Sequence, residues 1–363
     1  MIYFLLSKQN SHTIYRYLKE RGRPISGQIG VIHYEDLRPL QCLKCSALIF
    51  SDLDIIEGDQ LKIVCGIYDE IRKQHPALTI FNNPHRVKLR YSLLRSLHDS
   101  GINPFNIYRP DDNLNDIRFP VFIRQENNHI GALSPLLKNE KALQTYLQSL
   151  EMQGWKRKHL LIVEYEDVQT PDGYFVRYAA LRIGDEIYPY LIDYDQQWVA
   201  KYVDSPLKDT PQYASTYRDF STNFKEKHLL TTIFEMAGID YGRIDFSYSN
   251  GKPVVWEINL NPDYEYEENA HKHFEKGVRE IKRQTNARIL SNFRKLNGRK
   301  SHQIELDEEV FQGYNDLGSA PGLTKQLGVK IINVLPIKKE LLTLKRALYL
   351  IWARVVLVLK RRK

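Results

Sequence analysis

Cysteine is scarce in this chain of 363 residues, which has only Cys42, Cys45 and Cys65. Three cysteines are too few for the disulfide scaffold of a small secreted protein. Cys42 and Cys45 have the spacing of half a zinc site or of a redox pair, but no second close Cys/His pair supplies the remaining zinc ligands. A redox pair would stand at a strand-to-helix turn, whereas here the apolar run 47–50 follows directly. We therefore interpret the cysteines as reduced and without a joint role.

The chain also lacks an N-terminal leader and a long apolar run. No charged, apolar, small-residue segment opens the sequence, so we expect a cytoplasmic protein. The apolar stretch 341–359 is interrupted by three basic residues, and falls short of the 18 or so uninterrupted apolar residues of a membrane span. Two interpretations of it stay open. In the first, it forms an amphipathic helix that lies on an anionic membrane, which would place the protein at the inner membrane face. In the second, it forms a helix that packs on the body of the protein and exposes its basic end.

Net charge is nearly absent outside the C-terminal tail. The formal charge is +8, and residues 338–363 hold nine basic residues against one acid, so the other 337 residues are neutral overall. The basic character therefore belongs to the tail. It gives no reason to expect that the body of the protein binds nucleic acid.

No G-x-G-x-x-G follows any predicted strand, which excludes the usual dinucleotide fingerprint. The first 108 residues nevertheless alternate between strand-like and helix-like segments, typical of a small open α/β sheet. We predict strands over residues 2–6, 29–33, 47–50 and 78–81. We predict helices over residues 13–21, 60–74 and 86–100, the last after the chain break Asn82-Asn83-Pro84.

What the chain does contain is the stretch GRIDFSYSNGKPVVWEINLNP, residues 242–262. Two strand-like runs flank Asn250-Gly251, which is a strong hairpin signal. Because side chains alternate along a strand, each arm presents a pair of functional groups on one face. These are Arg243 and Asp245 on the first arm, and Glu257 and Asn259 on the second.

That face suits a metal bound together with phosphate. Mg²⁺ prefers hard oxygen ligands, usually one or two carboxylates plus the phosphates of a nucleotide. Asp245, Glu257 and the Asn259 carbonyl would supply such oxygens, and Arg243 would neutralise charge on a transferring phosphoryl group. An ordinary hairpin with polar residues on its solvent side is the alternative.

GRIDF followed by WEINLNP resembles the metal-binding end of the ATP-grasp superfamily, which includes D-alanine–D-alanine ligase, glutathione synthetase and the ribosomal-protein glutamate ligases. In that pattern an Arg-x-Asp strand pairs with a Glu-x-Asn strand across two Mg²⁺ ions. The resemblance implies an α/β ATP-grasp fold and places Asp245, Glu257 and Asn259 at the metal. Arg243 is then the expected catalytic residue.

Looser resemblances extend the ATP site towards the N-terminus. The strand 119–124 ends in Arg124, where the family has a phosphate-binding lysine followed by a glycine-rich flap. Arginine keeps the charge but changes the donor geometry, and the loop 125–134 has a single glycine, Gly131. Lys201 lies in an Ala-Lys-Tyr passage similar to that of D-alanine–D-alanine ligases, where the lysine contacts ATP phosphate.

The strand beginning at His159 ends in Glu164 and Glu166, and in the family a glutamate there faces the nucleoside. Either residue fits that role, and an exposed acidic strand end is the alternative for each. Strands are predicted over 174–183 and 186–192. Arg177 and Arg182 differ by an odd number of positions, so only one of the two arginines is expected to face the cleft.

We also predict helices over residues 139–150, 221–237 and 270–296. The expected domains are 1–108 before the ATP-grasp fold, 109–166 as its small subdomain, 167–298 as its C-terminal subdomain with the metal site, and 299–363 as linker and basic helix.

Four acidic residues follow Pro262 (Asp263, Glu265, Glu267, Glu268). They favour an amine-bearing acceptor, or they form a solvated loop.

The resemblance implies an ATP-dependent ligase that activates a carboxylate as an acyl phosphate, which an amine then attacks to form an amide or peptide bond. Its cofactors would be ATP and two Mg²⁺ ions, its partners a small-molecule or peptide substrate, and no nucleic acid. Dimers are common in the family. Two alternatives stay open. They are a phosphotransferase acting on a hydroxyl and a catalytically silent, nucleotide-binding, membrane-associated component of a biosynthetic pathway.

Overall fold

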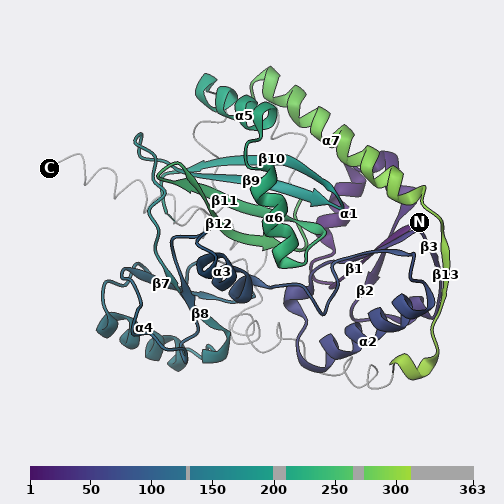
Figure 1. Cartoon of the computed structure of the whole chain (residues 1–363), viewed down its shortest axis with the longest axis horizontal. Coiled ribbons are helices and arrows are strands. Elements are labelled where there is room, and N and C mark those ends of the chain that lie inside the picture. The colour runs from purple at the N-terminus through teal and green to yellow at the C-terminus, as the bar shows by residue number, and fades with distance from the viewer. Residues whose placement is uncertain (128–130, 199–209, 265–273, 312–363) are drawn as a thin grey trace, which may run out of the picture. The chain divides into compact units, whose positions relative to one another are not determined.

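The structure is a computed structural model that describes residues 1–127, 131–198, 210–264 and 274–311 (Figure 1). These residues belong to one compact unit, Met1–Gln312. The basic tail, including the stretch 341–363, lies outside the described residues, as does Lys201. Within the described ranges, no helix has both the length and the apolar character needed to cross a bilayer.

The N-terminal sheet is parallel and has the strand order β2-β1-β4-β5. Its strands are β1 (Ile2–Leu6), β2 (Ile29–His33), β4 (Ala47–Phe50) and β5 (Thr79–Phe81). Helices α1 (His12–Lys19) and α2 (Gly58–Gln74) connect its strands. All four side chains of β4 are buried, as expected for a parallel strand covered on both faces. The predicted strands and helices of this region are confirmed to within a few residues.

A two-stranded ribbon corrects the expectation of a linker after residue 298. Strand β13 (His302–Glu305) pairs antiparallel with β3 (Cys42–Cys45), and Ile304 is fully buried in that ribbon. Four residues with one apolar side chain give too weak a periodic signal to be recognised in the sequence. The ribbon also separates the two cysteines, because Cys42 is exposed and Cys45 buried.

A three-stranded antiparallel sheet follows, with the order β6-β8-β7. Its strands are β6 (Ile107–Tyr108), β7 (Val121–Gln125) and β8 (Leu160–Glu164). Helix α4 (Glu140–Met152) packs Leu143, Leu147 and Leu150 against this sheet. The Asn139 side chain caps α4 by accepting a hydrogen bond from the backbone N–H of Ala142.

The largest antiparallel sheet has the order β10-β9-β11-β12. Its strands are β9 (Phe175–Ile183), β10 (Glu186–Asp195), β11 (Tyr241–Ser249) and β12 (Lys252–Asn259). The predicted hairpin turn is confirmed, with positive φ at both Asn250 (49°) and Gly251 (75°). The sequence therefore identified this hairpin with its turn.

Four helices complete the described fold. Two helices, α5 (Pro211–Asn223) and α6 (Lys227–Ala237), replace the single helix predicted over 221–237, and the break falls at Phe224. Gly238 caps the C-terminal end of α6, with a φ of 65° in the left-handed region. Helix α3 (Arg90–Asp99) starts later than predicted, and α7 (Lys276–Asn297) ends the series.

Asn82 joins the N-terminal sheet to the largest sheet. Its fully buried side chain donates hydrogen bonds to the backbone carbonyls of Phe50 and Tyr241. The oxygen of the Asn82 side-chain amide accepts hydrogen bonds from the backbone N–H groups of Asp240 and Tyr241. The Asn-Asn-Pro chain break therefore holds the start of β11, and through it the hairpin that carries the predicted site.

Candidate active site

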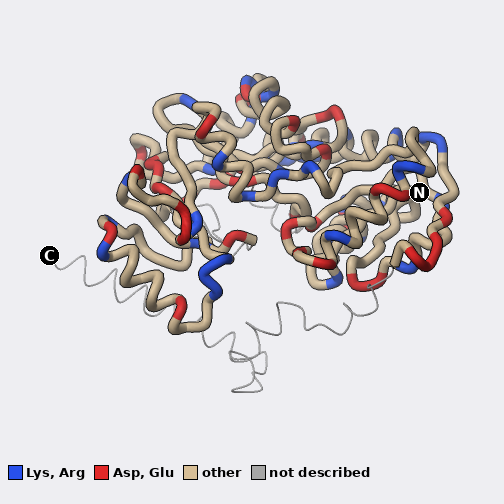
Figure 2. Tube along the Cα trace, turned by 60° about the horizontal axis from the view of Figure 1, so that its bottom comes forward, with Lys and Arg blue, Asp and Glu red and all other residues tan. Residues whose placement is uncertain are grey.

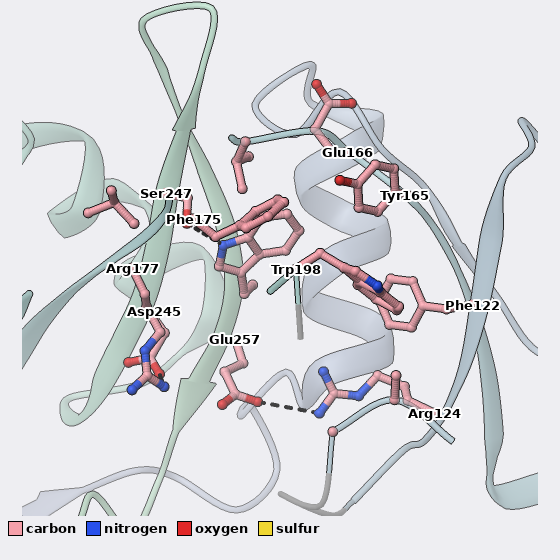
Figure 3. A pocket seen from close by; sticks show the side chains of 15 residues that line it. Phe122, Arg124, Tyr165, Glu166, Phe175, Arg177, Trp198, Asp245, Ser247 and Glu257 are labelled. Carbon is pink, nitrogen blue, oxygen red and sulfur yellow. Dashed lines mark hydrogen bonds and ion pairs between the residues drawn. The ribbon is translucent and has the colours of Figure 1, made fainter. Parts of the chain in front are cut away.

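A cavity of about 210 Å³ opens where β7 faces the sheet of β9, β11 and β12 (Figure 3). Phe122 and Arg124 of β7 line one wall, and Asp245 and Glu257 of the hairpin line the opposite wall. Four charged side chains (Arg124, Arg177, Asp245, Glu257) lie at one end of the cavity, and aromatic rings lie at the other end together with Glu166. A pocket of this kind suits a ligand with an anionic part and a planar part.

The register of the hairpin brings the predicted residues together. Arg243 is paired with Asn259 and Asp245 with Glu257, directly across β11 and β12. The register then shifts between Asp245 and Phe246. This β-bulge leaves Trp256 as an extra residue, and both Trp256 and Glu257 line the cavity although they are neighbours in sequence.

Asp245 is 2% exposed and lies between two guanidinium groups. Arg243 Nε donates to Asp245 Oδ1 at 2.8 Å, and Arg177 donates to Oδ2 at 3.2 Å. Arg177 also donates to Asp193 at 2.5 Å. Burial disfavours the charge of Arg177, but Asp245 and Asp193 more than offset this and raise the pKa of its guanidinium.

Glu257 is held from the other side of the cavity. Arg124 lies 3.7 Å from it, and Arg90 of α3 donates a hydrogen bond to the same carboxylate. Burial lowers the pKa of Arg124 to about 9, helped by the charge of Arg90 and opposed by Glu257. The crowding of two guanidinium groups at one carboxylate therefore favours the entry of a further anion.

The structure places Glu164 and Glu166 in different surroundings. Glu164 is 3% exposed and accepts hydrogen bonds from the backbone N–H groups of Asn106 (3.0 Å) and Arg118 (2.8 Å). It does not line the cavity, whereas Glu166 does. Glu166 accepts from the Ser249 hydroxyl at 2.7 Å and pairs with Arg118 at 3.1 Å. Strand β8 ends at Glu164, so Glu166 lies beyond the strand that carries Glu164.

Of the two arginines on β9, Arg177 faces the cavity. Arg182 lies on the other side of the sheet, where its Nε donates to the Gly184 carbonyl and its guanidinium lies over the Phe234 ring. The prediction that only one of them reaches the site is confirmed. Asn259 is not among the cavity-lining residues, and its side-chain oxygen accepts from the backbone N–H of Asn261.

Sequence reasoning missed the aromatic end of the site and Arg90. Trp198 packs against Phe122 at 5.1 Å between ring centroids and against Tyr165 at 5.8 Å. Trp256 donates a hydrogen bond to the Ser247 hydroxyl, which fixes its indole at the cavity wall. No periodic pattern marks these rings. The one sequence signal for Arg90 was the helix predicted over residues 86–100, after the Asn-Asn-Pro break.

The oxygen atoms of the hairpin carboxylates suit a metal ion that has further ligands. Asp245 and Glu257 are paired, hard-oxygen donors, and each carboxylate can accept more hydrogen bonds or metal bonds than its arginines use. Among the described residues no group of three or more His, Cys, Asp or Glu side chains is placed to hold a metal. Two carboxylates fit Mg²⁺ that arrives with the phosphates of a nucleotide, not a metal held by protein ligands alone.

The fold is of the α/β class that the sequence predicted. The hairpin with paired Asp and Glu forms part of an antiparallel sheet, and a second, smaller sheet faces it across the cavity. Arg124 reaches the cavity from the smaller sheet and Arg177 from the larger one. This is the arrangement that the resemblance to ATP-grasp proteins implied.

No protein-family model matches the sequence, and neither does any curated protein. Solved structures similar to this chain include D-alanine–D-alanine ligase from Bacillus anthracis, at 11% identity, a TM-score of 0.45, and coverage of 80% of this chain and 98% of that one. They also include the D-cycloserine synthetase DcsG, at 13% identity, TM-score 0.45, and coverage of 80% and 99%. A RimK domain ATP-grasp protein from Sphaerobacter thermophilus has 12% identity, TM-score 0.38, and coverage of 79% and 100%. Likeness at these values says nothing about the reaction.

Proposed function

We propose that the cavity binds ATP together with Mg²⁺ and that the protein is a carboxylate–amine ligase. The observation that carries the proposal is the pairing of Asp245 with Glu257 opposite Arg124, at the charged end of a cavity whose other end is aromatic. Trp198 and Trp256 offer flat apolar surfaces to a base, and Glu166 offers a carboxylate to ribose hydroxyls. Glu164 has no part in this assignment.

The charge of the site supports a polyanionic ligand. Four guanidinium groups (Arg90, Arg124, Arg177, Arg243) meet three carboxylates (Asp193, Asp245, Glu257). The surplus is positive, and it lies in a partly buried setting where charges are poorly screened. Phosphate groups would relieve the repulsion between Arg90 and Arg124. Lys201 and the loop 128–130 fall outside the described residues, and their contribution stays a prediction.

In the proposed reaction, an oxygen of the substrate carboxylate attacks the γ-phosphorus of ATP. The bond from that phosphorus to the β–γ bridging oxygen breaks, and ADP leaves. The amine nitrogen then attacks the acyl carbon, the bond to the phosphate oxygen breaks, and inorganic phosphate and a proton are released. Arg124 and Arg90 bind the phosphates, and Arg243 holds Asp245 and offsets developing charge. Bound at Asp245 and Glu257, Mg²⁺ would supply further charge neutralisation on the phosphates.

Trapping of the acyl phosphate tests this reaction directly. Pools of carboxylates are incubated with the protein, Mg-ATP and hydroxylamine, which converts an acyl phosphate into a stable hydroxamate. A ligase gives hydroxamate and ADP in equal amounts only when its carboxylate is present. A phosphotransferase would give a phosphomonoester and no hydroxamate, which would overturn the proposed reaction while keeping nucleotide binding.

One observation favours the silent nucleotide-binding protein as a second candidate. Both hairpin carboxylates are engaged by arginines in this structure, so metal binding must compete with ion pairs. A protein that binds ATP by its arginines alone would show equal affinity with and without Mg²⁺. It would form no ADP with any combination of carboxylate and amine.

A further inference from the structure

The neutrality of residues 1–337 conceals a strong separation of charge. Residues 1–275 contain 32 basic and 37 acidic residues, whereas residues 276–300 contain nine basic residues and a single acid. Figure 2 shows basic and acidic residues interspersed over most of the described chain. The segment 276–300, which is α7 and the three residues after it, is therefore a concentrated basic element within a mildly acidic body.

The cations of α7 lie on its solvent side. The buried face of the helix consists of Val278, Ile289, Leu290, Phe293 and Leu296. At 3.6 residues per turn, Lys276, Arg279, Arg283 and Arg294 fall within about 60° of one another, in an arc centred roughly 100° from the middle of the buried face. These four side chains belong to exposed residues, and so does Lys295 next to them. Figure 1 shows α7 running from beside α5 towards β3 and β13.

Few of these charges are neutralised within the described part of the chain. Arg283 pairs with Glu280 at 2.8 Å, and Arg288 with Glu186 at 3.9 Å. Lys276, Arg279, Arg294 and Lys295 make no ion pair with any residue in the described ranges. The helix has 22 residues and is about 33 Å long, and these cations extend along most of its length.

We propose that this basic ridge of α7 (Lys276, Arg279, Arg283, Arg294, Lys295) docks on an anionic lipid surface. A straight row of cations with its apolar side buried suits a flat, negatively charged plane and offers no apolar side chain for insertion. Each Lys or Arg near such a surface contributes on the order of 1 kcal/mol.

The composition of the tail points to a lipid surface over other polyanions. The chain continues into residues 341–359, which contain aliphatic residues, Trp352 and basic residues, and then into a Lys-Arg-Arg-Lys end. Stable peripheral attachment takes two signals, such as an apolar anchor together with a polybasic patch. The ridge supplies the second signal. The inference is independent of the proposed ligase activity.

The test is co-sedimentation of the full chain with vesicles of phosphatidylcholine alone or with phosphatidylglycerol added. The ridge variant combines Lys276→Gln, Arg279→Gln, Arg294→Gln and Lys295→Gln. The control combines Arg23→Gln, Lys141→Gln, Lys227→Gln and Lys252→Gln, four exposed cations elsewhere that make the same change in net charge. Unchanged melting temperatures show that both variants fold.

We expect binding of the native chain to anionic vesicles only, weakening as salt rises because exposed charges are screened beyond about 8 Å at 0.15 M. The ridge variant should lose roughly tenfold or more in vesicle partitioning, and the control should change by less than about twofold. Equal losses, no loss in the ridge variant, or equal binding to neutral vesicles would overturn the proposal. So would a ridge variant that loses binding to an RNA oligonucleotide but keeps vesicle binding.

Discussion

Arg90 of α3 donates a hydrogen bond to Glu257 of β12, 167 positions later in the chain. The same guanidinium donates to the backbone carbonyl of Glu126, at the end of β7. One side chain therefore touches both walls of the candidate active site. With Arg124 it places two cations at the hairpin carboxylate that the sequence assigned to a metal.

The first prediction compares the two arginines of β9. Arg177→Leu leaves Asp193 and Asp245 without their shared partner, and we expect a loss of stability on the order of 3 kcal/mol together with loss of ATP binding. Arg182→Leu should also destabilise the fold, because Arg182 is 7% exposed and hydrogen-bonded, but should leave ATP affinity unchanged. Thermal unfolding and calorimetric titration measure the two effects. Equal ATP affinity in both variants would remove Arg177 from the site.

The second prediction concerns pH. A bound triphosphate favours the charged form of Arg124, so its pKa should be higher in the complex than the value of about 9 in the free protein. Affinity for Mg-ATP should then be constant between about pH 7.5 and 8.5 and fall as pH rises through 9. ATP is already fully ionised over that range.

Arg124→Gln is the control for this pH dependence. The variant should bind Mg-ATP more weakly at pH 8, and its affinity should stay flat where that of the native protein declines. If the native protein shows the same flat profile up to pH 10, Arg124 does not contact the phosphates.

The third prediction concerns the cysteines. Burial raises the pKa of Cys45 to about 11, so at pH 8 only about one molecule in a thousand has the reactive thiolate there. Cys42 is exposed and should react with an alkylating reagent well before Cys45. Mass spectrometry of the partly labelled protein gives the order, and all three cysteines should react after unfolding. A native disulfide between Cys42 and Cys45 would contradict the ribbon of β3 and β13.

The fourth prediction tests whether residues 302–305 belong to the fold. Ile304 is fully buried, and Ile304→Ala should destabilise the protein by roughly 2–5 kcal/mol. Gln303→Ala, on the exposed side of the same strand, should change stability by less than about 0.5 kcal/mol. Chemical denaturation of both variants measures the difference. An equal, small effect would mean that this segment behaves as the linker that the sequence suggested.

The sequence predicted most strongly where local patterns decide the structure. The apolar runs 2–6, 29–33 and 47–50 became buried strands at the predicted positions, and Asn250-Gly251 placed the hairpin. Strand alternation alone put Arg243 with Asp245, and Glu257 with Asn259, on one face of each arm, whereas the pairing of Asp245 with Glu257 also depends on the bulge after Asp245. These features depend on neighbours in sequence or directly across one turn.

Features that depend on distant contacts were not predictable in the same way. Arg90 reaches the site because α3 packs beside β12, which no local pattern in its helix shows. The helical spacing of apolar residues continues across Phe224, and no Gly or Pro marks the end of α5 there. The break between α5 and α6 therefore gave no signal in the sequence. Glu164 and Glu166 look equivalent until the end of β8 and the backbone donors around Glu164 are known.

The central claim is that Asp245 and Glu257 bind nucleotide-borne Mg²⁺, and melting temperatures with Mg²⁺, ATP and Mg-ATP test it most directly. Ligand at 100 times its dissociation constant stabilises by about 2.7 kcal/mol, and each kcal/mol raises the melting temperature by roughly 2–4 °C for domains of 150–250 residues. We predict little shift with Mg²⁺ alone and a clear shift with Mg-ATP. The shift should disappear in Glu257→Gln but persist in Glu126→Gln, a buried glutamate paired with Arg109 outside the cavity. No shift of the native protein under saturating Mg-ATP, or an undiminished shift in Glu257→Gln, would contradict the account.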